Sequence, residues 1–168
     1  VLHLACHGHQ KTGAGAFTLG FQEDMDGIMV EPGMLAAAIA TGCAREDGHS
    51  RGSIECVVIN ACFGSEIAKL LKHEHQVPWV VTWATAVNDH AAQTFAEVFY
   101  GRLAKGGNDY QEAFDQAKLS LELRHWMTDE EVGDPEEGED NPKLLARQRR
   151  QQNPNLKAAG IPKLYPRV

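Results

Sequence analysis

The stretch that decides the fold runs Ile54-Glu55-Cys56-Val57-Val58-Ile59-Asn60-Ala61-Cys62-Phe63-Gly64-Ser65. A short apolar run rich in Val and Ile, bounded by a turn signal, predicts a core strand of a covered parallel sheet. Gly64 predicts a turn that leads into a helix. Parallel sheets of this kind place ligand sites just beyond the carboxyl ends of their strands. Cys62 stands at that position and is therefore the first candidate functional residue.

A second strand pattern, Val1 to Cys6, ends in the same way, at His7-Gly8-His9. If the two strands are neighbours, the His7 imidazole and the Cys62 thiol meet at one edge of the sheet. An imidazole can remove the proton of a thiol or stabilise its thiolate, and it can later protonate a leaving amine. Without further information, Cys62 could equally be one more buried cysteine and His7 a surface residue.

The rest of the chain alternates strand and helix patterns, which predicts an α/β sheet with helices on its faces. Further strands are expected at 16–21, 28–30 and 77–82, with a short last strand at 164–165. Helices are expected at 32–41, 65–75, 88–103 and 109–123. Residues 7–12 are predicted to form a loop, and Ser65 is the predicted N-cap of its helix.

Composition divides the chain into a core at 1–127, a flexible insertion at 128–160 and a tail or last strand at 161–168. Eight acidic residues and no basic ones lie between Asp129 and Asp140, and they account for the formal net charge of −7. The remainder has 16 basic and 15 acidic residues, a net charge of +1. It therefore lacks the basic field of a nucleic-acid-binding protein. No apolar run approaches the ~18 residues that a membrane span needs.

The four cysteines form neither a disulfide framework nor a CxxC pair. Cys6 and Cys56 lie in apolar strand patterns and are expected to be small core residues. A working thiol must stay reduced, which favours a cytoplasmic location. The chain begins inside a strand pattern, so we expect it to be an N-terminally truncated part of a longer protein.

Two dipeptides then suggest a family. His7-Gly8 ends one strand pattern, and Ala61-Cys62 ends another 55 residues later. This order resembles the caspase-like cysteine peptidases, with their histidine about 50 residues upstream of the cysteine. Within that group the chain is most similar to the CHAT domain, a module often attached to tetratricopeptide repeats. The segment 83–106, with Asp89, Ala91, Phe99-Tyr100, Leu103 and Gly106, and then Ala113 and Ala117, also resembles the CHAT pattern.

The resemblance implies a caspase-like three-layer sandwich with a mostly parallel sheet, and the activity of a cysteine endopeptidase. His7 would be the general base and acid, and Cys62 the nucleophile. The backbone amides of Gly8 and Cys62 would form the oxyanion hole. No cofactor or metal is implied. The implied partners are a peptide or protein substrate and an upstream repeat domain.

The same resemblance suggests where substrate would bind. Asn60 and Ala61 precede the nucleophile, and Asn60 holds the position where caspases carry Gln and metacaspases Asp to recognise the P1 side chain. A neutral Asn lacks the carboxylate of a pocket for Arg or Lys. Asp24 or Asp26 could supply one from the hairpin. The P1 preference therefore stays open.

Three alternatives compete with a peptidase. A metal site could use soft and borderline ligands, and the candidates are Cys6, His7, His9, Cys62, His73 and His75. These residues do not show the paired Cys/His spacing of a structural zinc motif. A serine hydrolase could use Ser65 as its nucleophile, but the sequence around Ser65 lacks the Gly-x-Ser-x-Gly motif of such enzymes. A non-catalytic scaffold would bind partner proteins through the sheet edge and the Trp79/Trp83 strand.

Overall fold

The computed structural model describes residues 1–9, 16–19, 28–44, 52–124, 126–127, 157–158 and 160–166. It has an α/β fold with a four-stranded, mostly parallel open sheet and four helices in this part of the chain. Two compact units are present, Val1–Ala84 with Lys163–Val168, and Thr85–Pro162.

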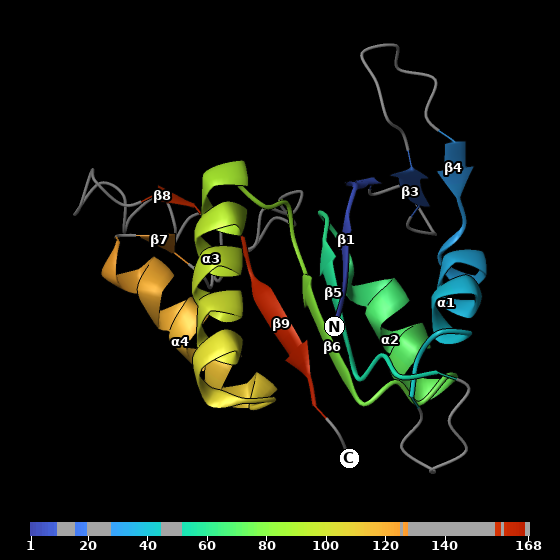
Figure 1. Cartoon of the computed structure of the whole chain (residues 1–168). Helices are drawn as coiled ribbons and strands as arrows, with labels where there is room; N and C mark the ends of the chain where they lie inside the picture. The colour runs from blue at the N-terminus through green and yellow to red at the C-terminus, as the bar shows by residue number, and fades with distance from the viewer. Residues whose placement is uncertain are drawn as a thin grey trace. The chain divides into compact units, whose positions relative to one another are not determined.

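The first unit is organised around a sheet with the strand order β1-β5-β6-β9 (Figure 1). Its strands are β1 (Leu2–Ala5), β5 (Cys56–Asn60), β6 (Trp79–Trp83) and β9 (Pro162–Tyr165). β5 pairs in parallel with β1 on one side and with β6 on the other. Figure 1 shows β9 running in the opposite direction to β6. The parallel pairing of β1 with β5 meets the condition under which the strand ends before His7 and Cys62 lie at one edge of the sheet.

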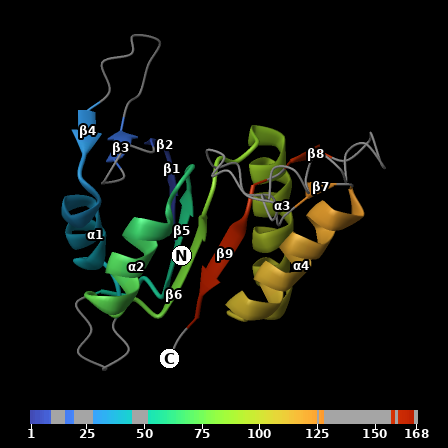
Figure 2. The same ribbon diagram turned by 180° about the vertical axis from the view of Figure 1, so that it is seen from behind.

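Two helices of the first unit, α1 (Pro32–Ala40) and α2 (Ser65–His73), share one hydrophobic core with the sheet. Figures 1 and 2 both show them side by side. Side chains alternate between the faces of a strand, so every second residue of β5 faces the helices. The members of this core with no exposed surface are Ala36, Val57, Ile59, Ile67, Ala68, Leu71, Val77 and Val80.

A small antiparallel sheet, β2 (His7–His9), β3 (Ala16–Leu19) and β4 (Ile28–Val30), follows β1. The expected hairpin of 16–21 with 28–30 is confirmed, with β3 ending at Leu19. The predicted loop at 7–12 is wrong for His7–His9, whose backbone pairs with β3. Pairing with a distant strand overrides the turn preference of Gly8.

The turn into α2 depends on Gly64, which is the N-cap in place of the predicted Ser65. The Gly64 N–H donates to the Trp83 carbonyl at 2.8 Å. A Cβ at Gly64 would overlap the Thr82 hydroxyl oxygen, so only glycine brings the turn this close to β6. The start of α2 and the end of β6 are thereby fixed to each other.

The second unit contains the helix pair α3 (Asp89–Gly106) and α4 (Tyr110–Leu123). The Asn88 side chain accepts from His90 N–H and Ala91 N–H and caps α3. Phe95 and Phe114 pack edge to face between the helices, with ring centroids 5.6 Å apart. Both predicted helices are confirmed, and α3 extends three residues beyond its expected end.

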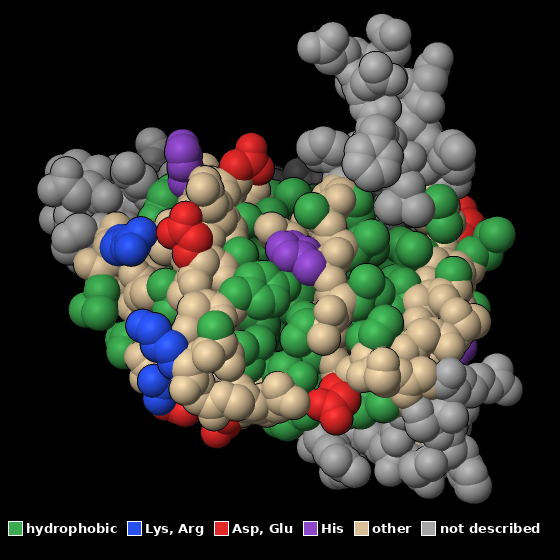
Figure 3. Space-filling view, in the orientation of Figure 1, with side chains coloured by type: hydrophobic (Ala, Val, Ile, Leu, Met, Phe, Trp, Pro, Cys, Tyr) green, Lys and Arg blue, Asp and Glu red, His purple; other side chains and the backbone are tan. Residues whose placement is uncertain are grey.

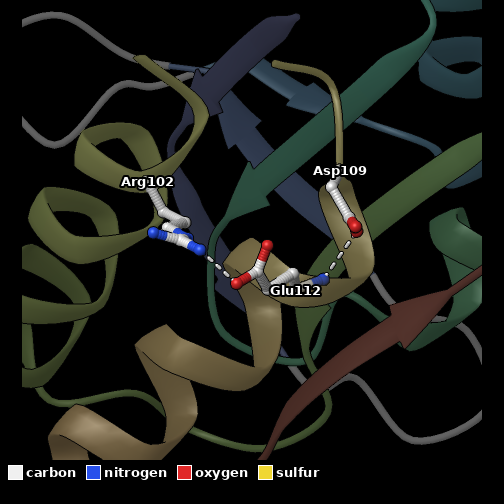
Figure 4. Close-up of polar contacts among 3 residues, drawn as sticks. All are labelled: Arg102, Asp109 and Glu112. Atoms are coloured by element: carbon white, nitrogen blue, oxygen red, sulfur yellow. Dashed lines mark hydrogen bonds and ion pairs between the residues drawn. The ribbon is translucent and has the colours of Figure 1, made fainter. Parts of the chain in front are cut away.

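The connection between α3 and α4 is closed by polar contacts (Figure 4). Asp109 Oδ1 accepts from the Glu112 N–H at 2.9 Å and caps α4. Arg102 of α3 forms an ion pair with Glu112. Figure 3 shows that the Lys and Arg side chains in view gather over α3 and α4.

A short parallel pair, β7 (Trp126–Met127) with β8 (Lys157–Ala158), completes the second unit. β8 falls within the segment expected to be an irregular insertion, most of which lies outside the described residues. Gly160 follows at a φ of 95°, and a Cβ there would overlap the Ala86 carbonyl. The Ile161 N–H donates to Thr85 Oγ1 at 2.9 Å. None of the helices described is long and apolar enough to cross a membrane.

Candidate functional site

The site is built where two neighbouring parallel strands end. β1 and β5 pair in register, with Leu2 beside Val57 and Ala5 beside Asn60. The ladder continues one step further, because the Cys6 N–H donates to the Asn60 carbonyl at 3.4 Å. His7 and Cys62 each lie two residues beyond the last registered pair. The backbone therefore brings the histidine-bearing and cysteine-bearing ends to the same edge of the sheet.

Cys62 lies in the turn between β5 and α2 and is partly exposed. Phe63, the next residue, has a φ of 56°, in the left-handed region that bulky residues rarely adopt. Such strained conformations cluster at functional sites and persist where the surrounding structure enforces them. Here the enforcing contacts are the buried strand before Cys62 and the Gly64 hydrogen bond to Trp83 after it. The fold thus holds Cys62 in a fixed, partly accessible position.

A second thiol lies near Cys62. Burial, and to a smaller extent a negative charge on Cys62, raise the pKa of Cys6 to about 11. Cys6 is half-buried and packs against the core shared by β1, β5 and the helices. At neutral pH the Cys6 thiol is therefore protonated and poorly nucleophilic.

The other two cysteines are structural. Cys43 is buried, and its thiol donates to the Ile39 carbonyl at 3.3 Å. Cys56 is fully buried within β5, and burial raises its pKa to about 12. None of the four cysteines is in a disulfide.

Asn60 has a hydrogen bond that could not be predicted from the sequence. The Trp83 indole Nε1–H donates to Asn60 Oδ1 at 3.1 Å. Ile59 is level with Thr82 in the β5–β6 register, so Asn60 and Trp83 follow as the next pair of neighbours. Trp83 is only 3% exposed, whereas Asn60 is partly exposed. The scaffold alternative gives the Trp79/Trp83 strand a role in partner binding, but Trp83 is buried and holds the side chain of Asn60.

The remaining predicted site residues differ in what the structure says of them. Ala61 is 1% exposed and belongs to the hydrophobic core, so only its backbone could contact a substrate. His7 and Gly8 are described in their backbone alone, as part of β2. Asp24 and Asp26 lie outside the described residues.

The structure also locates residues of the alternative sites. His73 and His75 lie at the C-terminal end of α2, whereas Cys62 precedes its N-terminal end, so the helix separates them by about 13 Å. Within the described part of the chain, no three His, Cys, Asp or Glu side chains gather as metal ligands would. β6 is an inner strand between β5 and β9, so the Trp79/Trp83 strand is not an edge of the sheet.

Neither a protein-family model nor a curated protein matches the chain.

Proposed function

We propose that the chain is a cysteine endopeptidase domain of the caspase-like CHAT type, with the three-layer sandwich of that group. The observation that carries the proposal is the in-register parallel pairing of β1 with β5, after which His7 and Cys62 follow at equal offsets. A His-Cys dyad needs this arrangement, because the imidazole must reach the thiol to activate it.

The proposed reaction proceeds through an acyl-enzyme. His7 takes the proton of the Cys62 thiol, and the sulfur attacks the carbonyl carbon of the scissile peptide bond. The backbone amides of Gly8 and Cys62 donate to the oxyanion of the tetrahedral intermediate. His7 then gives its proton to the leaving amine, the C–N bond breaks, and a thioester remains. His7 next takes a proton from water, which hydrolyses the thioester to release the carboxylic acid and restore the thiol.

Two features of the site suit this chemistry. Cys62 is partly exposed and held by a strained turn, whereas Cys43 and Cys56 are buried. The neighbouring thiol of Cys6 has a raised pKa and does not compete as a nucleophile at neutral pH. A nucleophile of this kind works in a reducing compartment, and we place the protein in the cytoplasm.

The test compares three variants in hydrolysis of a peptide library with mixed P1 residues. Cys62→Ala should abolish hydrolysis, and His7→Ala should lower the rate by about 10²–10⁴-fold, the contribution of a general acid and base. Cys6→Ala is the matched control, because it removes the nearest other thiol and should leave the rate largely unchanged. Hydrolysis that survives Cys62→Ala, or no hydrolysis of any peptide by the parent chain, contradicts the proposal.

A second candidate function is a non-catalytic module that binds a partner segment. It is favoured by the position of β1, whose only neighbouring strand in the described sheet is β5. An exposed strand edge can accept an extended peptide as an additional strand. In that case Cys62→Ala and Cys6→Ala would both leave partner binding intact, and peptides would bind without being cleaved.

A further inference from the structure

Two of the four cysteines lie side by side at the edge of the sheet where β1 and β5 end. The Cys6 N–H donates to the Asn60 carbonyl at 3.4 Å, which continues the β1–β5 ladder by one step. In a parallel ladder this bond places Cys6 level with Ala61. Cys62 is the next residue along the chain, so the backbone makes Cys6 and Cys62 diagonal neighbours.

The spacing of diagonal neighbours suits a disulfide. Adjacent strands are about 4.8 Å apart and rise about 3.3 Å per residue, so the Cα atoms of such neighbours are roughly 6 Å apart. Disulfides join residues whose Cα atoms are about 4.4–6.8 Å apart. β5 ends at Asn60, and Cys62 lies in the turn that follows. The Cys62 side chain is therefore not held to the alternation of a strand, which would point it away from Cys6.

The two thiols also interact, and an oxidant can reach them. A negative charge on Cys62 contributes to the raised pKa of Cys6. Cys6 and Cys62 are partly exposed, whereas Cys43 and Cys56 are buried. A charge on Cys43 likewise contributes to the raised pKa of Cys56. The buried cysteines thus form a second neighbouring pair that a solute cannot reach, and they provide a comparison within the same chain.

We propose that Cys6 and Cys62 are a redox pair, in which hydrogen peroxide oxidises the Cys62 thiol and Cys6 then closes a disulfide with it. In the first step the Cys62 sulfur attacks one peroxide oxygen. The S–O bond forms, the O–O bond breaks, and the departing hydroxide leaves as water with the thiol proton. In the second step the Cys6 sulfur attacks the Cys62 sulfenic acid. The S–S bond forms, and the hydroxyl group leaves as a second water with the Cys6 proton.

The order of the two steps follows from the surroundings of the thiols. Burial holds the Cys6 thiol in its protonated form at neutral pH, in which it reacts poorly with peroxide. Cys62 lies in a turn and is partly exposed, so it meets the peroxide first. Cys6 is held next to it and can react with the sulfenic acid without a bimolecular encounter. Cys6 is therefore the resolving cysteine.

The disulfide would occupy the sulfur that the proposed peptidase uses as its nucleophile. Hydrolysis would stop until a thiol reductant reopens the bond. The bond would also protect Cys62 from irreversible oxidation to the sulfinic and sulfonic acids. Only this loss of hydrolysis rests on the proposed function, because the formation of the disulfide needs the two thiols alone.

Peptide mapping tests the pair directly. The full chain is reduced, freed of reductant, exposed to equimolar hydrogen peroxide, alkylated in urea and digested with trypsin without reduction. Cys6 lies in the tryptic peptide 1–11 and Cys43 in 12–45, whereas Cys56 and Cys62 share 52–69. Mass spectrometry should find 1–11 joined to 52–69, with 12–45 alkylated. The map is repeated with Cys56→Ala, which should keep the link and so assign it to Cys62.

Two variants identify the resolving thiol. Cys6→Ala should abolish the link, and dimedone, which reacts with sulfenic acids, should then label Cys62. Cys43→Ala is the matched control, because it makes the same change at a buried cysteine and should keep the link. Peptide hydrolysis by the parent should be lost after peroxide and restored by dithiothreitol. In Cys6→Ala under excess peroxide the loss should persist, since the oxidation of Cys62 continues to the irreversible acids.

The inference is overturned if Cys62 stays reduced, becomes a sulfinic or sulfonic acid without a link to 1–11, or joins Cys43 or a second chain. The map of the parent decides this even if Cys6→Ala does not fold. A Cys6–Cys62 link in a chain that hydrolyses no peptide refutes the peptidase and leaves the redox pair standing. Hydrolysis by a chain that forms no link refutes the redox pair alone, so the two failures are distinguishable.

Discussion

Gly64 provides the sharpest test of how the candidate site is held in place. Its backbone is ordinary, with a φ of −77° and a ψ of 1°, so alanine would adopt it without strain. The obstacle to alanine is instead the neighbouring strand. A Cβ at Gly64 would overlap the hydroxyl oxygen of Thr82 and come within 3.2 Å of the Thr82 Cβ. We therefore predict that Gly64→Ala is destabilising for a purely steric reason.

The magnitude follows from what Thr82 can do in response. Thr82 is 1% exposed, and its β-branched side chain has few χ1 alternatives. The turn must move away from β6, which also weakens the hydrogen bond from Gly64 to Trp83. Overpacking of this kind costs about 1–3 kcal/mol of the free energy of unfolding. The cost should fall by at least about 1 kcal/mol in a Thr82→Ala background, where the overlapping oxygen is gone.

The assay is urea unfolding followed by far-UV circular dichroism, for both single variants and the double variant. Gly101→Ala is the control, because Gly101 lies in α3 and a Cβ there meets no atom within 4 Å. It should raise stability by up to about 1 kcal/mol through helix propensity alone. If Gly64→Ala behaves like Gly101→Ala, or if Thr82→Ala does not reduce its cost, steric overlap with Thr82 does not explain why residue 64 is glycine.

Two further predictions concern a helix cap and a buried thiol. Asn88→Ala removes the side chain that accepts from His90 and Ala91 and should lower the free energy of unfolding by about 1 kcal/mol, whereas Asn88→Asp should largely preserve it in the same urea assay. Burial raises the pKa of Cys56 to about 12, so the folded state holds this proton more tightly than the unfolded chain. Its contribution to stability is complete below about pH 8.5 and is lost as the pH rises toward 12, by about 1.4 kcal/mol per pH unit. Urea unfolding at pH 8 and pH 10 should show a smaller alkaline loss for Cys56→Ala than for the parent, and equal losses would contradict the assignment.

The sequence was sufficient for the elements that bury continuous or periodic apolar surface. β5 and β6 are unbroken runs of apolar residues in the sheet interior, and α3 and α4 show helical spacing of buried side chains. A mostly parallel sheet was also predicted, but that β1 and β5 are neighbours in it was only assumed and is shown by the structure. For the candidate site, this placed the His7 and Cys62 backbones at one edge of the sheet.

What could not be predicted depends on contacts between distant residues. His7–His9 form a strand only because β3 pairs with them. Gly64, and not Ser65, caps α2 because the turn packs against Thr82. The hydrogen bond from Trp83 to Asn60 joins residues that the β5–β6 register makes neighbours, and no local pattern indicates that register. Two-residue strands such as β7 and β8 are too short to show a periodicity.

The parallel pairing of β7 with β8 affects how the sequence between them can change. Both ends of the segment between these strands are anchored within one unit, by the β7–β8 pair and by the hydrogen bond from Ile161 to Thr85. The entropy of closing a loop grows only with the logarithm of its length, so that each doubling costs ~0.6 kcal/mol. Related proteins could therefore differ widely in the number of residues between these strands while keeping α3, α4 and the anchor at Gly160. This segment is thus the natural position for a reporter domain inserted into the chain.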